Sequence, residues 1–507
     1  MNPAIFREYD IRGIADKDFD VPFAQALGQA YGTYVRAQGK KRIAVGRDCR
    51  LTSDKYAAAL RHGLRSTGID VLDIGTCPTP LMYFSLHHYD LDGGLQVTGS
   101  HNPADHNGFK ICVGKFTIHG EEIQELRKLV ESGRFTTGQG KEEPAPIIPP
   151  YQEFVIKQFG RLSRKIKVVI DAGNSTAGPV APRIFREMGC QLTELFCDLD
   201  GRFPNHHPDP TIPENLTQLI ATVKATGAEV GVAYDGDADR VGLVDRHGRI
   251  VWGDEMMVLF ARDILQRHPG ATIVSEVKCS QRLFDDVAKH GGTPIMWKVG
   301  HSLLKAKMRE TSAHLGGEMS GHIFFADRYF GYDDAIYASC RMMEILANSG
   351  KELSDLLSDL PPSFTTPEIR VDCPDEQKFQ IADKVRDHFR GQYDIVDVDG
   401  VRVKFPDGWG LVRASNTQPV LVLRFEAKTQ EKLTEYRTLV EDVVEVLPAN
   451  LIVRDKFAEQ NLGRRAVHDD SDGLALVLRQ YIIERLTHTR HHILQRLAAR
   501  QIGRAHV

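Results

Sequence analysis

Short apolar runs alternate with amphipathic stretches of helical length along most of this 507-residue chain. The runs at 41–46, 71–75, 95–98, 167–171, 229–234 and 271–275 are predicted strands, and 56–66 is a predicted helix. Alternating strands and helices are typical of α/β domains. From 364 to about 453 the pattern changes to α+β, with a predicted Gly-Trp-Gly loop at 408–410 ahead of a strand at 420–425. The pattern predicts three related α/β domains in series and a smaller α+β C-terminal domain.

Breaks in this pattern place the domain boundaries. The stretch 138–150 is rich in proline, glycine and charge, and is the clearest predicted linker. We expect α/β domains at 1–147, 148–248 and 249–361, and the α+β domain at 362–453. The tail at 454–507 breaks the pattern, and its end, 502–507, resembles translated sequencing adapter. We therefore expect the extreme C-terminus to be a gene-model artefact.

Composition narrows the classes of partner and compartment. A formal net charge of −4 gives no footprint for nucleic acid or for an anionic membrane. Neither a signal peptide nor an apolar window of about 20 residues is present in the sequence, so we expect a cytoplasmic protein. The 8 cysteines form no C-x-x-C pair, which fits a reducing compartment without a disulfide framework.

One loop offers a candidate nucleophile or phosphate carrier. The string TGSHNP at 98–103 presents Ser100 in a Gly/Asn/Pro turn with His101 beside it. A serine hydroxyl is a weak nucleophile and needs a base, a metal or prior phosphorylation. The Gly-x-Ser-x-Gly elbow of α/β hydrolases is absent from this string. Lys110, a few residues on, could stabilise transferring charge. Alone, the string is equally compatible with an ordinary surface turn.

A second loop, DGDADR at 235–240, offers Asp235, Asp237 and Asp239 at alternate positions. Carboxylates gathered at one point repel each other unless a cation neutralises them, and oxygen ligands suit Mg²⁺. Arg240 and Arg246 stand where an EF-hand requires glycine and glutamate, which excludes that site. Two alternatives remain: a solvated acidic turn, or an aspartyl-phosphate site with Asp235 as nucleophile and Asp237 as acid.

Further loops carry groups suited to a phosphorylated sugar. GGEMSGH at 316–322 could read vicinal hydroxyls, with a histidine available for proton transfer. RASNT at 413–417 combines a guanidinium with hydroxyl and amide donors, as a phosphate clamp would. Single cations recur in the loops that contain Arg12, Lys278 and His301. Each of these strings alone could be a flexible turn or a surface charge.

Taken together, the strings resemble, in type, order and spacing, those of the α-D-phosphohexomutases, most closely the bacterial phosphomannomutase/phosphoglucomutase branch, over roughly residues 4–453. The resemblance implies four domains around a central cleft and a phosphoserine at Ser100. It also implies an Mg²⁺ site at Asp235, Asp237 and Asp239, with the phosphoserine oxygen as a further ligand.

The same resemblance assigns the remaining site residues. Glu318 and Ser320 are expected to read the sugar. The non-reacting phosphate is expected to bind Arg413, Ser415, Asn416 and Thr417. Further active-site positions are Tyr9, Arg12, His101, Lys110, Arg240, Lys278, His301 and His322. Two departures from the family pattern are His106, where tyrosine is common, and Gln418, where threonine or glutamate is usual; neither removes an assigned group.

The implied reaction is reversible transfer of a phosphoryl group between the 1- and 6-positions of a hexose phosphate. Ser100 would phosphorylate the substrate, and the resulting hexose 1,6-bisphosphate would turn around and return its other phosphoryl group. Arg12, Lys110 and Mg²⁺ would stabilise the transferring group, with His322 as general acid or base. Hexose phosphates are the expected partners, and we expect a monomer with a mobile fourth domain.

Three alternatives remain open at this point. Met319 favours glucose and mannose phosphates over glucosamine phosphate, but phosphoglucosamine mutase is the nearest alternative activity. A sugar phosphatase that uses Asp235 covalently is the second. A sugar-phosphate binding protein without catalysis is the third, and the intact serine, histidine and aspartates argue against it.

Overall fold

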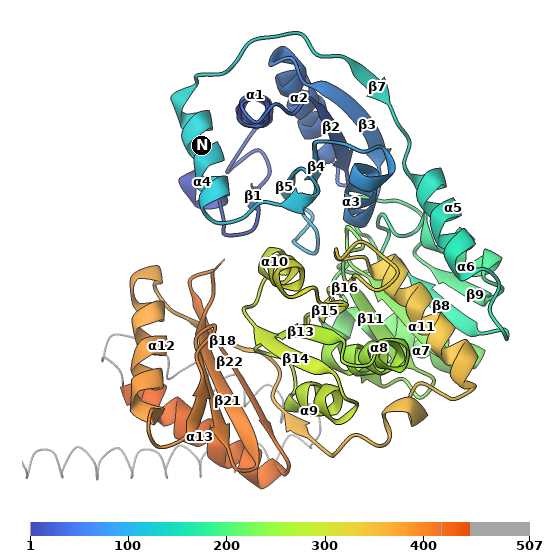
Figure 1. The fold of residues 1–507 in the computed structure, drawn as a ribbon, viewed down its shortest axis with the longest axis vertical. Helices are drawn as coiled ribbons and strands as arrows, with labels where there is room; N and C mark the ends of the chain where they lie inside the picture. The colour runs from blue at the N-terminus through green and yellow to red at the C-terminus, as the bar shows by residue number, and fades with distance from the viewer. Residues whose placement is uncertain (1, 417, 447–507) are drawn as a thin grey trace, which may run out of the picture.

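Four sheets, formed by four successive segments of the chain, organise residues 2–416 and 418–446, the part described by this computed structural model. Figure 1 shows the four units as an arc, with domain I at the top, domain II at the right, domain III in the centre and domain IV at the lower left. The first three sheets mix parallel and antiparallel pairs, whereas the fourth is antiparallel in every described pair. The predicted fold class is confirmed. Both the tail at 454–507 and Thr417 lie outside the described residues.

Domain I is built on a mixed sheet in the order β1-β5-β4-β2-β3-β7, with β6 paired to β5. Its strands are β1 (Ile11–Ile14), β2 (Arg42–Arg47), β3 (Asp70–Thr76), β4 (Gly93–Val97), β5 (His106–Val113), β6 (Phe116–Thr117) and β7 (Glu142–Pro144). Its helices are η1 (Pro3–Ile5), α1 (Val21–Arg36), α2 (Ser53–Ser66), α3 (Thr79–His88) and α4 (Glu121–Ser132). The predicted elements at 41–46, 56–66, 71–75 and 95–98 all appear here, with ends shifted by up to three residues.

Domain II repeats the central part of this topology in the order β12-β11-β10-β8-β9. Its strands are β8 (Lys167–Asp171), β9 (Gln191–Leu195), β10 (Val230–Tyr234), β11 (Val241–Asp245) and β12 (Ile250–Val251). Its helices are α5 (Ile148–Phe159), α6 (Ala181–Glu187), η2 (Pro213–Leu216) and α7 (Thr217–Thr226). Both strands predicted for this domain are present.

Domain III has the order β14-β13-β15-β16. Its strands are β13 (Thr272–Glu276), β14 (Thr293–Trp297), β15 (Leu315–Gly317) and β16 (Ile323–Phe325). Its helices are α8 (Gly253–Arg267), α9 (Gln281–Lys289), α10 (His301–Thr311), α11 (Ala335–Ser349) and η3 (Asp355–Leu357).

The same connection carries the candidate chemistry in each of these three sheets. It joins a parallel strand to its antiparallel neighbour: β4 to β5, β10 to β11, and β15 to β16. These three connections contain the serine loop at 98–103, the aspartate loop at 235–240 and the loop at 318–322 that is predicted to read the sugar, respectively. The shared connection therefore supports the prediction that the three α/β domains are related, and it places three separate strings at equivalent positions.

Domain IV is an antiparallel sheet flanked by two helices. Its strands are β17 (Phe364–Thr365), β18 (Ile369–Asp372), β19 (Asp394–Val396), β20 (Val401–Phe405), β21 (Gly408–Ala414) and β22 (Val420–Ala427). Its helices are α12 (Asp375–Phe389) and α13 (Gln430–Val446).

The predicted loop at 408–410 is wrong, because these residues begin strand β21. A Cβ on Gly408 would lie 2.1 Å from the carbonyl oxygen of Glu426 on the paired strand β22. The glycine thus permits close strand approach, while Trp409 between the glycines is buried at 1% exposure.

The predicted linker at 138–150 is also more structured than its composition suggests. It contains β7, which pairs in parallel with β3, and it reaches the start of α5. Its backbone extends the domain I sheet: Val71 donates to the Lys141 carbonyl at 2.8 Å, and Ala145 donates to the Asp73 carbonyl at 2.8 Å. Proline is tolerated in such a strand at a sheet edge.

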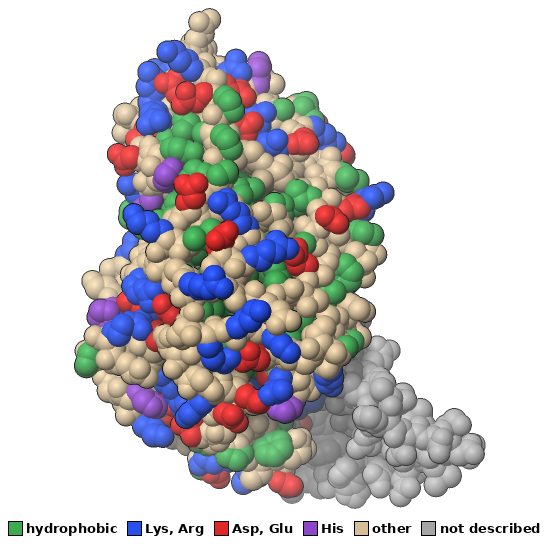
Figure 2. Space-filling view, turned by 90° about the vertical axis from the view of Figure 1, so that its right-hand side faces the viewer, with side chains coloured by type: hydrophobic (Ala, Val, Ile, Leu, Met, Phe, Trp, Pro, Cys, Tyr) green, Lys and Arg blue, Asp and Glu red, His purple; other side chains and the backbone are tan. Residues whose placement is uncertain are grey.

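Apolar packing joins the first three domains more closely than the fourth. One core cluster contains side chains from α3 of domain I and from domains II and III, whereas the core of domain IV is separate. On the face in Figure 2, acidic and basic side chains are interspersed. None of the helices within 2–416 and 418–446 has the length and hydropathy needed to cross a bilayer.

Candidate active site

The serine loop of domain I and the aspartate loop of domain II are in direct contact. Ser100 Oγ donates to Asp235 Oδ2 at 2.9 Å, and Ser100 is 2% exposed. A Cβ on Gly236 would lie 2.3 Å from the Ser100 carbonyl oxygen, so only glycine allows this approach. A second junction forms where Thr79, at the start of α3, donates through Oγ1 to Asp237 Oδ2 at 2.5 Å. The structure thus brings together the two strings on which the predicted chemistry depends.

Ser100 occupies a strained backbone conformation. Its φ is +48°, in the left-handed region that non-glycine residues seldom adopt. Such a conformation persists only where the surroundings enforce it, and it is found most often at functional sites. Ala238 in the aspartate loop has the same type of conformation, with φ of +55°. Both loops are therefore held in shapes that packing and hydrogen bonds must maintain.

Arg50 is the group that holds the serine loop, and sequence reasoning missed it. Its guanidinium donates to the carbonyl oxygens of Ser100, Asn102, Pro103 and His106, at 2.5 to 3.0 Å. The side chain is 2% exposed. A planar guanidinium can serve several acceptors at once because its donors point in fixed, divergent directions.

Asp48 also holds the serine loop. Its carboxylate accepts from Thr98 Oγ1 at 2.8 Å and from the Gly99 backbone at 3.1 Å, and it pairs with Arg50 at 3.2 Å. Both residues stand in the charged string that follows predicted strand 41–46. Charged residues at the end of a buried strand could have indicated a functional loop. The sequence does not show that these residues contact the serine loop.

The three aspartates of the second string are fully buried and converge. Their carboxylate oxygens lie within 4.8 Å of one another, and each residue is 0% exposed. Burial, together with repulsion from Asp239 and Asp237, raises the pKa of Asp235 well above its usual range. Burial also opposes ionisation of Asp237 and Asp239, but Lys110 outweighs it and lowers the pKa of both.

The triad fits a hard divalent cation. Asp237 Oδ1 is buried and has no hydrogen-bond partner among the described residues, which leaves one acceptor of the triad free. Lys110 Nζ bridges two of the aspartates: it donates to Asp237 Oδ2 at 2.8 Å and also to Asp239 Oδ2. An all-oxygen ligand set with a free acceptor is what Mg²⁺ requires.

His322 of domain III reaches the same cluster. Its Nδ1 lies 2.5 Å from Glu318 Oε2, and its Nε2 lies 3.1 Å from Asp239 Oδ1. Burial alone would lower the pKa of His322, but Asp239 and Glu318 raise it to about 9. The imidazole therefore carries both protons at neutral pH, and each nitrogen donates to a carboxylate. A second cation is close by, since Arg240 Nε lies 3.3 Å from His322 Nε2.

His101 and His301 differ from His322 in charge state. His301 is buried and His101 is half-buried, and this burial, with cations nearby, lowers the pKa of each well below its usual range. His101 Nδ1 lies 3.0 Å from Ser100 Oγ. A neutral imidazole next to the hydroxyl is able to accept its proton.

Glu318 holds the loop at 316–322 that is predicted to read the sugar. Glu318 accepts from the Gly300 backbone at 2.8 Å and from Ser320 Oγ at 3.2 Å. Burial opposes ionisation of Glu318, but His322 and Lys278 lower its pKa to about 2, so it is a carboxylate at neutral pH. Lys278 itself pairs with Glu368 of domain IV at 3.0 Å.

Domain IV contributes the remaining predicted site residues. Asn416 donates to the Tyr9 hydroxyl at 3.1 Å, and that hydroxyl donates to the Val299 carbonyl at 2.8 Å, which links domains I, III and IV. Arg413 pairs with Asp399 at 3.1 Å. Arg12 pairs with Asp10 at 2.5 Å and donates to Asn102 of the serine loop at 3.1 Å.

The departures from the family pattern are at the margins of the site. Gln418 accepts through its side chain from Arg370 at 2.5 Å, and its backbone donates to Ser415 Oγ at 3.2 Å. His106 pairs with Asp105 at 2.7 Å. Neither contact displaces an assigned side chain.

Comparison with known proteins decides the family. In chain order, residues 3–137, 149–248, 252–364 and 368–443 match the four domains described as phosphoglucomutase/phosphomannomutase alpha/beta/alpha domains I, II and III and C-terminal domain. The chain belongs to the phosphoglucomutase/phosphomannomutase family. The four segments cover nearly the whole described part of the molecule, so each of the contacts above lies within this family's domains.

Relatives within this family match over nearly their full lengths. Phosphomannomutase/phosphoglucomutase of Pseudomonas aeruginosa is 45% identical over 451 residues, which is 89% of this chain and 97% of the relative. Phosphoglucomutase of Neisseria meningitidis is 44% identical over 453 residues, 88% of this chain and 98% of the relative. A crystal structure of a phosphoglucomutase/phosphomannomutase family protein from Burkholderia thailandensis matches with a TM-score of 0.84 at 45% identity, covering 89% of this chain and 100% of that chain.

Replacing Arg50 with lysine is expected to displace the serine loop, because an ammonium has three donors and cannot serve four carbonyl oxygens as the guanidinium does. Misplacing a reacting group by about 1 Å costs about 100-fold in rate, so we expect a loss of that order in kcat. Arg47→Lys is the matched control, since Arg47 pairs with Asp54 and Asp73, away from the loop. Steady-state mutase assays with glucose 1-phosphate measure kcat for both variants. Equal kcat values for Arg50→Lys and Arg47→Lys would contradict the role given to Arg50.

Proposed function

We propose that this protein is a reversible phosphohexomutase that moves a phosphoryl group between the 1- and 6-positions of glucose or mannose phosphate. The contact that carries the proposal is the 2.9 Å hydrogen bond from Ser100 to Asp235, which joins a phosphate-carrying hydroxyl to a carboxylate triad. The relatives in Pseudomonas and Neisseria, a phosphomannomutase/phosphoglucomutase and a phosphoglucomutase, support the same activity.

The first half-reaction begins with Ser100 phosphorylated. The free hydroxyl of the sugar gives up its proton to a neutral histidine of the site as its oxygen attacks phosphorus. The bond from phosphorus to Ser100 Oγ breaks, and the serine oxygen takes up a proton, so one proton is released and one is taken up. Neutral His101 lies beside that oxygen and His322 carries a proton nearby. The product is a hexose 1,6-bisphosphate, and the reverse transfer from its other phosphate restores the phosphoserine.

Charge on the transferring group is met by fixed cations. Lys110 is buried among the aspartates, and Arg12 is fixed to the serine loop through Asn102. Such preorganised charges stabilise a phosphoryl transition state without reorganising during the reaction. Mg²⁺ held by Asp235, Asp237 and Asp239 would add Lewis-acid stabilisation to the same group.

The substrate must bind in two orientations, which explains the division of labour between the other loops. Glu318 and Ser320 are proposed to bind hydroxyls near the centre of the sugar, where the two orientations overlap. Arg413, Ser415 and Asn416 are proposed to hold whichever phosphate is not reacting. With Met319 in the sugar loop, we propose glucose and mannose phosphates ahead of glucosamine phosphate.

The cysteines and the core of domain IV support two further proposals, on the cellular compartment and on domain movement. All eight cysteines are free in the described structure, which supports a reducing compartment, and we propose the cytoplasm. Domain IV has its own core, and this supports its proposed movement as a unit when substrate binds.

The phosphatase alternative, with Asp235 as nucleophile, is less well supported by the contacts. One oxygen of Asp235 accepts from Ser100, and the other accepts from the backbone of Asp239 and Arg240 at 3.0 and 3.1 Å. A carboxylate whose two oxygens are both engaged in this way is poorly placed to attack phosphorus.

Two single variants separate these activities. Ser100→Ala removes the phosphate carrier, so the mutase is expected to lose at least about 1,000-fold in kcat, on the scale of removing a covalent nucleophile. Asp235→Asn is expected to be similarly impaired, because the triad loses a charge. Assays with glucose 1-phosphate and with mannose 1-phosphate measure both. A Ser100→Ala enzyme that still releases inorganic phosphate at the wild-type rate would point instead to Asp235.

Metal removal gives an independent test with a stability readout. We expect a chelator to abolish activity and Mg²⁺ to restore it. Mg²⁺ at about 100 times its Kd is also expected to stabilise the wild type by about 2.7 kcal/mol, seen as a higher Tm. Asp237→Asn is expected to lose this shift, and Asp198→Asn, an exposed aspartate of the same domain, is expected to keep it. An equal shift in Asp237→Asn would contradict the proposed metal site.

A further inference from the structure

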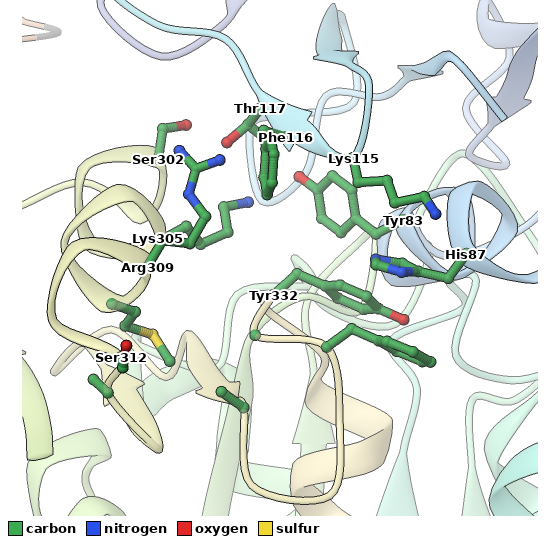
Figure 3. Close-up of a pocket in the computed structure, with 15 residues that line it drawn as sticks. Tyr83, His87, Lys115, Phe116, Thr117, Ser302, Lys305, Arg309, Ser312 and Tyr332 are labelled. Atoms are coloured by element: carbon green, nitrogen blue, oxygen red, sulfur yellow. The ribbon is translucent and has the colours of Figure 1, made fainter. Parts of the chain in front are cut away.

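A cavity lies between domains I and III, and it is lined by side chains that the proposed reaction does not use. It has a volume of about 250 Å³. Its walls come from α3, from the β5–β6 hairpin, from α10 and from the segment 326–332 (Figure 3). The catalytic loops at 98–103, 235–240 and 318–322 contribute no residue to its lining.

All the acid–base groups with a permanent charge that line the cavity are basic. The lining contains Lys115, Lys305 and Arg309 and no acidic residue. Lys305 and Lys115 have carboxylate partners outside the lining, Asp333 and Asp90, each at 2.9 Å. The Arg309 guanidinium forms neither an ion pair nor a side-chain hydrogen bond with any residue in 2–416 or 418–446, although Glu122 is close enough to attract it. At least one cationic group is therefore free to bind an anion from solution.

The remaining walls are largely flat aromatic rings. Phe330 and Tyr332 are stacked at 9°, and His87 stacks on Phe330 with ring centroids 4.2 Å apart. Burial lowers the pKa of His87 to about 4, so its ring is neutral at neutral pH. Across the hollow, the Arg309 guanidinium lies 3.7 Å from the centroid of Phe116. Flat apolar walls beside a cation suit a planar ring that carries an anionic group.

Tyr83 provides a separate indication that a polar ligand is missing. Its hydroxyl is buried, the residue is 3% exposed, and the oxygen has no hydrogen-bond partner among the described residues. Figure 3 shows this hydroxyl directed toward Phe116 on the facing wall. Lys305 Nζ lies 4.4 Å from the centroid of the same tyrosine ring. A buried hydroxyl without a partner is unfavourable, and a ligand oxygen in the hollow would satisfy it.

We propose that this cavity binds an aromatic phosphate, that is, a planar ring bearing one phosphate group, such as a nucleoside monophosphate. The ring would pack against the walls formed by Phe116 and by the pair Phe330 and Tyr332, on the sides that Arg309 and His87 do not cover. The phosphate would take Arg309 as its main partner, with the Tyr83 hydroxyl as an additional donor. The site is separate from the hexose-phosphate site, and the proposal does not depend on the proposed mutase activity.

Calorimetric titration of the full-length protein tests the proposal with AMP and phenyl phosphate as probes. Adenosine and inorganic phosphate serve as half-probes, and both are expected to bind at least about tenfold more weakly than AMP, because each lacks one of the two recognised features. Phe116→Ser and Arg309→Gln are each expected to raise the Kd for AMP by about tenfold. Phe379→Ser is the matched control, since Phe379 is 53% exposed and Phe116 is 52% exposed, but only Phe116 lines the cavity.

Arg413→Ala distinguishes this cavity from the proposed substrate site. AMP binding is expected to persist in this variant, while mutase activity is expected to persist in Phe116→Ser and Arg309→Gln. The proposal is overturned if AMP and phenyl phosphate do not bind the wild type, or if inorganic phosphate binds as tightly as AMP. It is also overturned if Arg413→Ala abolishes AMP binding while Phe116→Ser leaves it unchanged, because the probe would then occupy the substrate site.

Discussion

Mutual repulsion among three buried carboxylates is the constraint on which the rest of this structure depends. Asp235, Asp237 and Asp239 converge within 4.8 Å, where each pair of full charges repels by at least about 3.5 kcal/mol at an effective dielectric constant of about 20. The opposing charges come from different domains: Lys110 from domain I and the protonated His322 from domain III. Docking of the three α/β domains and neutralisation of the triad are therefore one event, which explains why the site lies where the domains meet.

Strain in the serine loop is maintained by the same docking. Ser100 holds a left-handed backbone because Arg50 fixes four carbonyl oxygens around it and because Asp235 of the neighbouring domain accepts its hydroxyl. The absence of a side chain on Gly236 lets the two loops touch. The hydroxyl that is proposed to carry phosphate is thus set by packing before any substrate arrives, as preorganised catalysis requires.

Sequence reasoning succeeded where a string carries its own chemistry and failed where a residue depends on a distant partner. The serine and aspartate strings were found because hydroxyl, imidazole and carboxylate groups at such close spacing already indicate a phosphate or metal site. Arg50 was missed because its role lies in carbonyl oxygens about fifty positions away in the chain, which no local pattern reveals. The errors at 408–410 and 138–150 have the same origin, since glycine and proline there serve strand pairing with β22 and β3 rather than turns.

The central claim is that Ser100 carries the phosphoryl group and that the aspartate triad supports it. Mass spectrometry of the peptide containing Ser100, after incubation of the enzyme with glucose 1,6-bisphosphate and Mg²⁺, tests this most directly. The account predicts one phosphoryl group on Ser100, which is replaced by a heavy-oxygen phosphoryl group when the enzyme is then given glucose 1-phosphate labelled in its phosphate. A Ser100 peptide that stays unmodified, or a phosphoryl group found on Asp235 instead, would contradict it.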